Sequence, residues 1–273
     1  MARPHIEFIQ TQNVDWSPSA DGSDCKILNA DPDSTEATLI VRYPPGYSAP
    51  AHSGTMPAEE YFVLEGSLEI GGKPRNLHDY GFLPGGSKAP SRTSEQGATV
   101  LIFRYAKDDP DSMEGVAEAI SLNTSTIPWD TTGFDPNLEH LRLARKVLRE
   151  APNNSCRTWL MVGMPHGVPL KSKLPAETHD HCEEMFMISG SMWAPEGHMQ
   201  PGAYFFRPPH ILHGPHVSEM DFFQIMRSPM TNKVYTHWSD EHRPLPIGAT
   251  YDPVVPDGTP ASWTRPWRPS ADY

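Results

Sequence analysis

The sequence predicts an all-β protein built from two similar β-barrels in tandem, with few short helices. A pattern of residues occurs twice in the 273-residue chain, and a repeat of such long period indicates two domains rather than a solenoid. The apolar runs are short and rich in β-branched and aromatic residues, which is typical of strands. Proline (30 residues) and glycine (20 residues) are frequent, and both interrupt helices.

The repeat is anchored on two glycines, Gly66 and Gly190, which are 124 residues apart. Each glycine ends a segment that begins with a pair of glutamates, Glu59-Glu60 in the first copy and Glu183-Glu184 in the second. The equal spacing of these features indicates that the same strand and turn occur in both halves.

The two copies differ at positions that can bind metal. The first copy reads Pro50-Ala-His52-Ser-Gly54, and the second reads Pro175-Ala-Glu177-Thr-His179. Further along the chain, Ala89 lies as far beyond its glycine as His213 lies beyond Gly190. The first copy therefore lacks two imidazoles that the second one carries, and we expect it to be a structural or substrate-shaping domain with a degenerate metal site.

The elements follow the same two-domain plan. We expect the boundary near residue 125, with an N-terminal barrel over residues 1–125 and a C-terminal barrel over residues 126–273. Helices are expected over residues 111–122 and 138–150, although the second segment could equally be a pair of strands. Beyond about Arg227 the chain is expected to be an irregular tail rich in proline and tryptophan. The predicted strands cover residues 37–43, 61–64, 99–104, 158–162, 185–188 and 222–226.

Composition excludes several classes of partner. The formal net charge is −12 and no Lys/Arg-rich run is present, so neither nucleic acid nor an anionic membrane surface is expected to bind. No stretch of about 18 apolar residues predicts a membrane span. The N-terminus lacks the features of a signal peptide, and three cysteines without a C-x-x-C motif indicate a reducing compartment. We expect a cytoplasmic protein that binds a small molecule.

Four side chains of the second copy have the spacing of metal ligands in a small barrel. Residues two apart in a strand share a face, so Glu177 and His179 can point to one site. Glu183 begins the next segment, and His213 follows from a later strand. Imidazole and carboxylate ligands suit Fe(II), Mn(II), Zn(II), Ni(II) and Cu(II).

The choice of one ligand stays open between two registers. In the register of the repeat, Glu177 and His179 form the pair and His181 lies in the turn. In the alternative register, His179 and His181 form the pair, which leaves a single residue before Glu183. Both registers retain His179 and His213 as ligands.

These residues resemble the cupin superfamily, whose motifs are roughly G-x5-H-x-H-x3-4-E-x6-G and G-x5-P-x-G-x2-H. Residues 202–213 match the second motif except that His210 replaces its inner glycine, and residues 183–190 match the E-x6-G half of the first. The segment from Pro175 to Phe186, together with His213-Gly-Pro-His216, is similar to ChrR-like cupins. The resemblance implies two tandem cupin barrels of the jelly-roll type, a bicupin.

The resemblance also implies a chemistry. It favours Fe(II) as the metal and a non-haem dioxygenase that couples O2 to a small diketone, enol-type or aromatic substrate. The alternatives are a metal-dependent lyase, isomerase or decarboxylase, in which Glu177 acts as a general base, and a non-catalytic ligand-sensing bicupin. His216 is expected to line the site or orient a ligand, and Arg207 to face an anionic substrate group or form a surface salt bridge. Cupin barrels often pair edge to edge, so a homodimer is expected.

Overall fold

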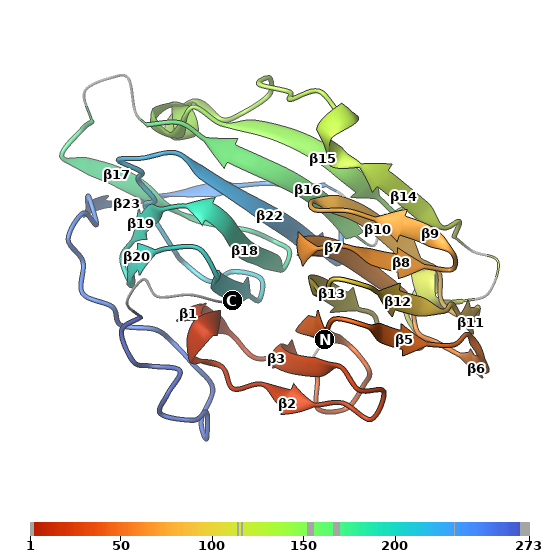
Figure 1. Cartoon of the computed structure of the whole chain (residues 1–273). Coiled ribbons are helices and arrows are strands. Elements are labelled where there is room, and N and C mark those ends of the chain that lie inside the picture. The colour runs from red at the N-terminus through yellow and green to blue at the C-terminus, as the bar shows by residue number, and fades with distance from the viewer. Residues whose placement is uncertain are drawn as a thin grey trace. The chain divides into compact units, whose positions relative to one another are not determined.

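The chain forms two compact units, both built almost entirely of strands (Figure 1). The computed structural model describes residues 3–113, 115, 117–151, 156–165, 170–231 and 233–267. The first unit contains Arg3 and residues 14–127, and the second contains residues 4–13 and the chain from residue 128 onward. None of the helices in this described part has the length and apolarity that crossing a membrane requires.

The first unit is a jelly roll of antiparallel strands. Its main sheets have the orders β14-β10-β7-β13-β4-β3-β2 and β5-β12-β8-β9, and β6 pairs with β11. Apolar residues from both main sheets form one core cluster, as alternation along half-buried strands requires. The strands are β2 (Ser17–Pro18), β3 (Asp24–Ala30), β4 (Ala37–Tyr43), β5 (Tyr47–Ala49), β6 (His52–Thr55), β7 (Glu59–Gly66), β8 (Leu68–Ile70), β9 (Lys73–Arg75), β10 (Asp79–Leu83), β11 (Lys88–Ala89), β12 (Arg92–Ser94), β13 (Ala98–Arg104) and β14 (Ile120–Asn123).

The second unit repeats this architecture. A six-stranded sheet has the order β1-β21-β18-β22-β16-β15, and two smaller sheets pair β17 with β23 and β19 with β20. Its core is rich in methionine and aromatic side chains. The strands are β1 (Ile6–Gln10), β15 (Ala144–Glu150), β16 (Cys156–Gly163), β17 (Lys173–Thr178), β18 (Glu183–Gly190), β19 (Met192–Ala194), β20 (Gly197–Met199), β21 (Ala203–Arg207), β22 (Phe222–Pro229) and β23 (His237–Pro244).

The repeated glycines have the same structural reason in both units. Gly66 ends β7 with φ 67°, and Gly190 ends β18 with φ 74°. A Cβ atom would lie 2.1 Å from the carbonyl oxygen of Gly97 in one unit and 2.0 Å from that of Asp221 in the other. Only glycine fits both the left-handed backbone and this close approach. The predicted all-β class, with two tandem jelly-roll barrels, is confirmed.

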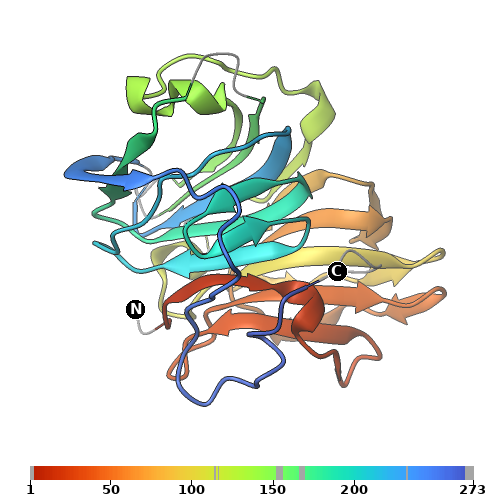
Figure 2. The same ribbon diagram turned by 90° about the vertical axis from the view of Figure 1, so that its left-hand side faces the viewer.

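The N-terminal strand belongs to the second unit. Strand β1 pairs with β21, with Ile6 opposite Phe206 and Gln10 opposite Ala203, and Figure 2 shows it in red next to the cyan strands of this unit. In the first unit, β14 pairs in the same way with β10. From the sequence, residues 4–13 were expected in the N-terminal barrel. The structure differs because every residue of β1 is buried in the second unit, a long-range pairing that no local pattern reveals.

Both helix candidates are wrong as helices. Residues 111–122 contain the end of a 3-10 helix at Pro110–Ser112 and the strand β14, with residues 114 and 116 outside the described chain. Residues 138–150 contain the end of a 3-10 helix at Pro136–Leu141 and then β15. Arg142 adopts a left-handed conformation (φ 46°) that ends this helix, so the alternative strand interpretation holds for residues 144–150.

The region after Arg227 is more regular than expected. Strand β22 continues to Pro229, and β23 pairs with β17 to form a small sheet. Proline is depleted in central strands but is tolerated at strand ends, where Pro229 and Pro244 lie. An irregular tail begins only after β23 and runs to the end of the described chain.

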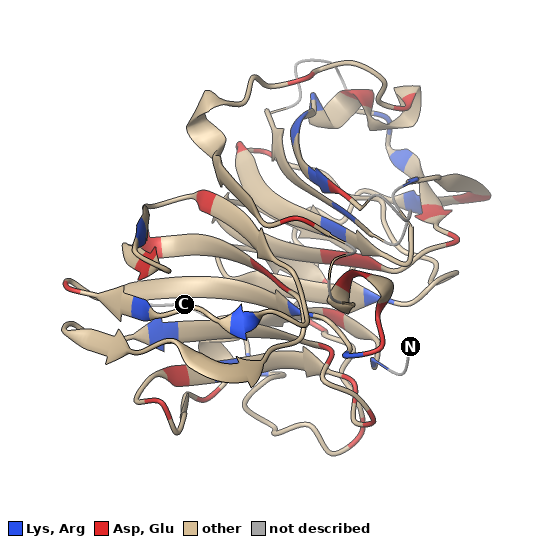
Figure 3. Ribbon diagram, turned by 90° about the vertical axis from the view of Figure 1, so that its right-hand side faces the viewer, with Lys and Arg blue, Asp and Glu red and all other residues tan. Residues whose placement is uncertain are grey.

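Charged residues lie on strands as well as in loops (Figure 3). Several of them are buried, including Glu59, Glu184, Arg207 and Arg227. Because burying a charge is costly unless it is paired, such residues have charged partners. Arg227 Nη1, for example, lies 3.6 Å from Glu184 Oε2. A larger group of this kind surrounds the predicted metal ligands.

Candidate metal centre

Three metal-ligating side chains meet in the second unit: Glu177, His179 and His213. One ligand atom of each lies within 4.8 Å of the other two. Glu177 is in β17, His179 follows directly, and His213 lies in the segment after β21. Two backbone hydrogen bonds of 3.0 Å join Glu177 and His213. This antiparallel bridge brings together side chains that are far apart in the sequence.

The two histidines present their Nε2 atoms as potential ligands. His179 Nδ1 lies 2.9 Å from the carbonyl oxygen of Tyr235, and His213 Nδ1 lies 2.9 Å from that of Ile211. A carbonyl oxygen only accepts hydrogen bonds, so each Nδ1 carries the proton and each Nε2 keeps its lone pair. Burial, followed by the nearby Arg207 guanidinium, lowers the pKa of His213 to about 4. His213 is therefore neutral at pH 7, as a metal ligand must be.

Glu177 supplies a carboxylate to the same group. Burial alone would raise the pKa of its carboxyl group, but the neighbouring His216 and His213 outweigh this effect and lower the pKa. His216 Nδ1 lies 3.7 Å from Glu177 Oε1. The group therefore contains two imidazoles and an ionised carboxylate.

Glu183 touches this group but is bound to an arginine. Its Oε2 atom accepts a 2.6 Å hydrogen bond from Arg207 Nη1 and lies 3.5 Å from His213 Nε2. Its Oε1 atom lies 3.7 Å from His179 Nε2. Burial would raise the pKa of Glu183, but His179 and Arg207 outweigh it and hold the pKa far below its usual value. Glu183 is therefore an ionised neighbour of Arg207, His179 and His213.

Arg207 is fully buried between two carboxylates. Besides Glu183, it binds Glu7 of strand β1, with a 2.6 Å hydrogen bond from Nε and a second from Nη2. Its guanidinium carbon also lies 3.6 Å from the centre of the Phe205 ring. Arg207 therefore forms a buried ion-pair network rather than the surface salt bridge considered from sequence. Glu7 could not be recognised in the sequence, because no motif links it to a residue 200 positions away.

His216 connects this network to Glu177. Arg207 Nη2 lies 3.3 Å from His216 Nε2, and because an arginine can only donate, Nε2 acts as the acceptor. The proton of His216 is then on Nδ1, the atom that faces Glu177. His216 thus lines the cavity and lies beside Glu177, a candidate ligand, and its expected role in orienting a ligand stays a prediction.

His181 lies outside the three-residue group. Its ring stacks on that of His179, with centroids 5.0 Å apart. Its Nδ1 atom lies 2.8 Å from the carbonyl oxygen of Cys182 and 3.1 Å from Ser228 Oγ. Of the two predicted registers, the structure assembles the one in which Glu177, rather than His181, joins His179 and His213.

The donor set fits a divalent cation on two grounds. His213 Nε2 is buried and has no hydrogen-bond partner among the described residues, and such orphaned atoms usually have a ligand or water as partner. The carboxylates of Glu7, Glu177 and Glu183 also outnumber the single guanidinium of Arg207. Three carboxylates thus face one guanidinium, and a divalent cation would offset this excess of acidic side chains.

A cavity of about 550 Å³ opens beside this group, within the range of small-molecule sites. Its polar part is formed by Glu177, His179, Glu183, Arg207 and His216. Most of the remaining wall is apolar and comes from Phe134, Leu138, Leu141, Leu143, Trp159, Met161, Met192, Phe205, Phe222, Met226 and Val234.

In the first unit, an arginine occupies the sequence position that His216 has in the second unit. Arg92 follows Gly66 at the distance at which His216 follows Gly190. Its Nη2 atom donates to Glu59, the counterpart of Glu183, and its Nη1 atom donates to Tyr43 Oη at 2.9 Å. In the first unit, the positive charge beside Glu59 is thus supplied by the Arg92 side chain, so no metal ion is needed there.

The backbone bridge between Glu177 and His213 has a counterpart in the first unit, but the residues there do not form a metal-ligating group. Ala89 pairs with His52 between β11 and β6, as His213 pairs with Glu177. His52 is exposed, and no three metal-ligating side chains of the first unit's described residues come together. These contacts agree with a structural role for this unit.

Replacing Arg92 by leucine is expected to destabilise the first unit by about 3 kcal/mol, because Glu59 would be left as an unpaired buried carboxylate. Urea unfolding would show this as a lower midpoint for that unit. The double variant Arg92→Leu, Glu59→Leu removes both charges and is expected to recover most of the loss. An Arg92→Leu protein as stable as the wild type would contradict the interpretation.

Known proteins were compared with both the sequence and the structure. The sequence matches the ChrR Cupin-like domain twice, over residues 5–108 and 118–230. No curated protein sequence matches the chain.

Similar solved structures have the same fold at low identity. A candidate dioxygenase from Nostoc punctiforme is 18% identical with a TM-score of 0.71, and the match covers 88% of this chain and 92% of that one. The protein Ylba from E. coli is 15% identical with a TM-score of 0.61, covering 84% and 92%. The oxalate decarboxylase of Lactobacillus farciminis, in a formate complex, is 10% identical with a TM-score of 0.57, covering 85% and 88%.

The two family matches together span most of the chain, one in each half. The structure shows the same strands and the same glycine turn in both units. The protein belongs to the ChrR-like cupin family and carries two copies of its domain.

Proposed function

We propose that the protein is a metal-dependent enzyme whose second unit binds Fe(II) through Glu177, His179 and His213. Its reaction would be a dioxygenation of a small organic substrate of the diketone, enol-type or aromatic class. The observation that carries the proposal is the convergence of two imidazoles and one carboxylate beside a largely apolar cavity. Two histidines and one carboxylate are the donor set of many non-haem iron oxygenases.

The bound iron would supply adjacent sites for an oxygen-containing substrate and for O2. The chain's own residues would provide the environment of the reaction. The Met, Phe and Leu side chains of the cavity wall would exclude water and hold the apolar body of the substrate. Glu177, held between His213 and His216, would keep its charge and position during turnover.

Arg207 has a positioning role in this proposal. It fixes Glu183 beside the two histidines, and its own charge is balanced by Glu7 from strand β1. It also fixes the tautomer of His216 through Nη2. These contacts leave the Nδ1 proton of His216 directed at the carboxylate of Glu177, which helps to hold that carboxylate in place.

Oxygen consumption tests the proposed reaction. Protein loaded with Fe(II) under anaerobic conditions is expected to turn over a 1,3-diketone such as acetylacetone or benzoylacetone only after O2 is admitted. With ¹⁸O2, the cleavage products together are expected to contain both labelled atoms. Product formation at the same rate without O2 would contradict the dioxygenase.

A second candidate is a metal-dependent lyase, isomerase or decarboxylase. The contact between Glu177 and His216 favours it, because a carboxylate beside an imidazole could move a proton. The similar structures also include an oxalate decarboxylase. Activity that requires a metal but does not change when O2 is removed would select this candidate over the first.

A further inference from the structure

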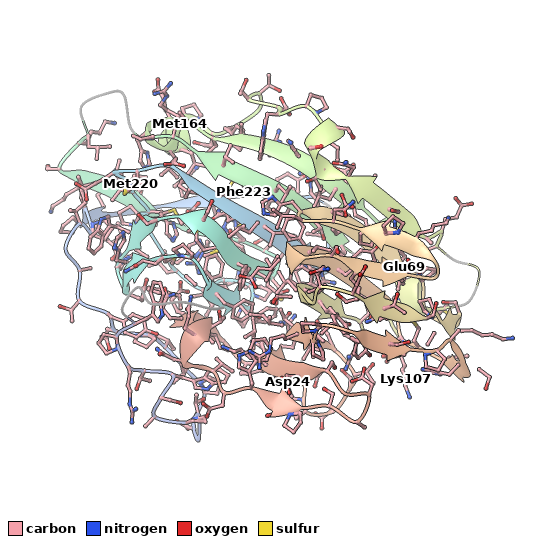
Figure 4. The ribbon with its side chains drawn as sticks, in the orientation of Figure 1. Asp24, Glu69, Lys107, Met164, Met220 and Phe223 are labelled. Atoms are coloured by element: carbon pink, nitrogen blue, oxygen red, sulfur yellow. The ribbon has the colours of Figure 1, made fainter. Side chains whose placement is uncertain are left out.

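A glutamine, Gln224, lies among the apolar residues of the cavity wall. Strand β22 presents Phe222, Gln224 and Met226 to the cavity, as every second residue of a strand shares one face. Gln224 lies opposite Met161 of β16 and Met187 of β18. Phe223, labelled on the same strand in Figure 4, has the opposite parity and contacts Trp129 instead. Gln224 is thus a polar residue with apolar neighbours on both sides.

The carboxamide of Gln224 is poorly satisfied by the protein. The side chain is 2% exposed, and its Nε2 atom contacts only the sulfur of Met226, at 3.3 Å. The Oε1 atom has no hydrogen-bond partner among the described residues. Exchanging the oxygen and nitrogen would not change this, since one end would still face the weakly polar sulfur. Buried polar atoms nearly always have a partner, and Gln224 is a lining residue of the cavity, so a ligand bound there is a candidate partner.

The other two arginines of the wall besides Arg207 are charged and lie beside protein oxygens, although Arg157 Nε forms no hydrogen bond with the described residues. Arg145 donates a 2.9 Å hydrogen bond to the carbonyl oxygen of Thr132. Arg157 lies 3.4 Å from the carboxylate of Glu150. Among the uncharged side chains of the wall that the structure describes, Gln224 is the one with a buried oxygen that lacks a hydrogen-bond partner.

Gln224 is far enough from the metal centre to contact the other end of a ligand. Its partner Met187 is four residues along β18 from Glu183. At a rise of about 3.3 Å per residue, the two positions are about 13 Å apart along the strand. The side chains of Glu183 and Gln224 both line the cavity. The distance between their polar ends therefore suits a small substituted molecule.

We propose that Gln224 determines specificity by hydrogen-bonding a hydroxyl or amide group at the far end of the substrate. The substrate would then have three parts: a chelating oxygen group at the metal centre, an apolar middle, and this polar end. The inference rests on the proposed function, because that function places the first part at the metal. A ligand without the polar end would displace water from Gln224 and replace none of its hydrogen bonds, which lowers affinity.

Two matched probes test this inference. Benzoylacetone carries a chelating diketone on an apolar ring, and 1-(4-hydroxyphenyl)butane-1,3-dione adds a hydroxyl at the far end of the same ring. Binding is measured by titration calorimetry with the full-length protein loaded with Zn(II), which prevents turnover with O2. The wild type is expected to bind the hydroxylated probe about tenfold more tightly, the effect of one hydrogen bond in a dry site. In Gln224→Leu the preference is expected to vanish or reverse.

Met161→Leu is the matched control, since it alters an apolar residue opposite Gln224 in the same cavity wall and leaves the carboxamide and its Met226 contact in place, and it should keep the preference. Gln224→Leu should unfold at the wild-type temperature or above, because leucine leaves no polar atom unpaired. The inference would be overturned if the wild type bound both probes with equal affinity, or if Gln224→Leu kept the preference. A clear loss of thermal stability in Gln224→Leu would also overturn it. None of these results would contradict the proposed function. Failure of both probes to bind the Zn(II)-loaded wild type would contradict the proposed function together with the inference.

Discussion

Replacing His213 by alanine is expected to lower metal affinity at least 100-fold and to abolish metal-dependent activity. Its buried Nε2 atom has no partner among the described residues, and its low pKa keeps it neutral and ready to bind. Even residues that only orient a ligand contribute 10- to 100-fold to metal affinity, so loss of a ligand should exceed that. Elemental analysis of the dialysed protein measures the first effect, and an assay with added Fe(II) measures the second.

His181→Ala is the matched control for this variant. His181 is equally buried, and its Nε2 atom also lacks a hydrogen-bond partner among the described residues, but it lies outside the three-residue group. The control is expected to retain its metal. Equal metal content in His213→Ala and the wild type, or loss of metal in His181→Ala alone, would reject the ligand assignment in favour of another register.

Replacing Arg207 by methionine is expected to destabilise the second unit by about 3–5 kcal/mol. The substitution keeps an apolar stem over Phe205 but removes the charge that pairs with Glu7 and Glu183. Leaving buried carboxylates unpaired is among the most destabilising changes in a protein. With a urea dependence of about 2–3 kcal/mol per molar, the unfolding midpoint should fall by about 1–2 M.

The double variant Arg207→Met, Glu7→Gln is the control, because it also removes one of the two carboxylates and should recover part of the loss. Acid unfolding gives an independent measure. Burial would raise the pKa of Glu7, but Arg207 outweighs it and lowers the pKa from 4.5 to about 2. Its contribution to stability is therefore complete above about pH 5 and is lost as the pH falls toward 2. A wild type no more acid-sensitive than Glu7→Gln would contradict this account.

Much of the fold could be predicted because its determinants are local. Gly66 and Gly190 are required by a left-handed turn that recurs at a fixed spacing, and short apolar runs bounded by Pro and Gly identify most central strands. The segment 138–150 was assigned to a helix with strands as an alternative, because its leucines and charges suit either structure. Pairing of β15 with β16 selects the strand, and that choice depends on tertiary contacts.

In the candidate site, too, some residues could be predicted from the sequence and others could not. Glu177, His179 and His213 could be found because their spacing reflects one strand and one bridge. Glu7 could not, since its role depends on β1 pairing with β21. Gln224 sits in an apolar run, where a single polar residue usually marks the solvent face of a strand. Only the register of β22 against its neighbours shows that it faces the cavity.

The most direct test of the central claim is X-ray diffraction at the metal absorption edge, on crystals of the metal-loaded protein. One anomalous peak is predicted in the second unit, about 2.0–2.2 Å from His179 Nε2, His213 Nε2 and a carboxylate oxygen of Glu177. A peak coordinated by His181 instead, or a metal bound only in the first unit, would contradict the account.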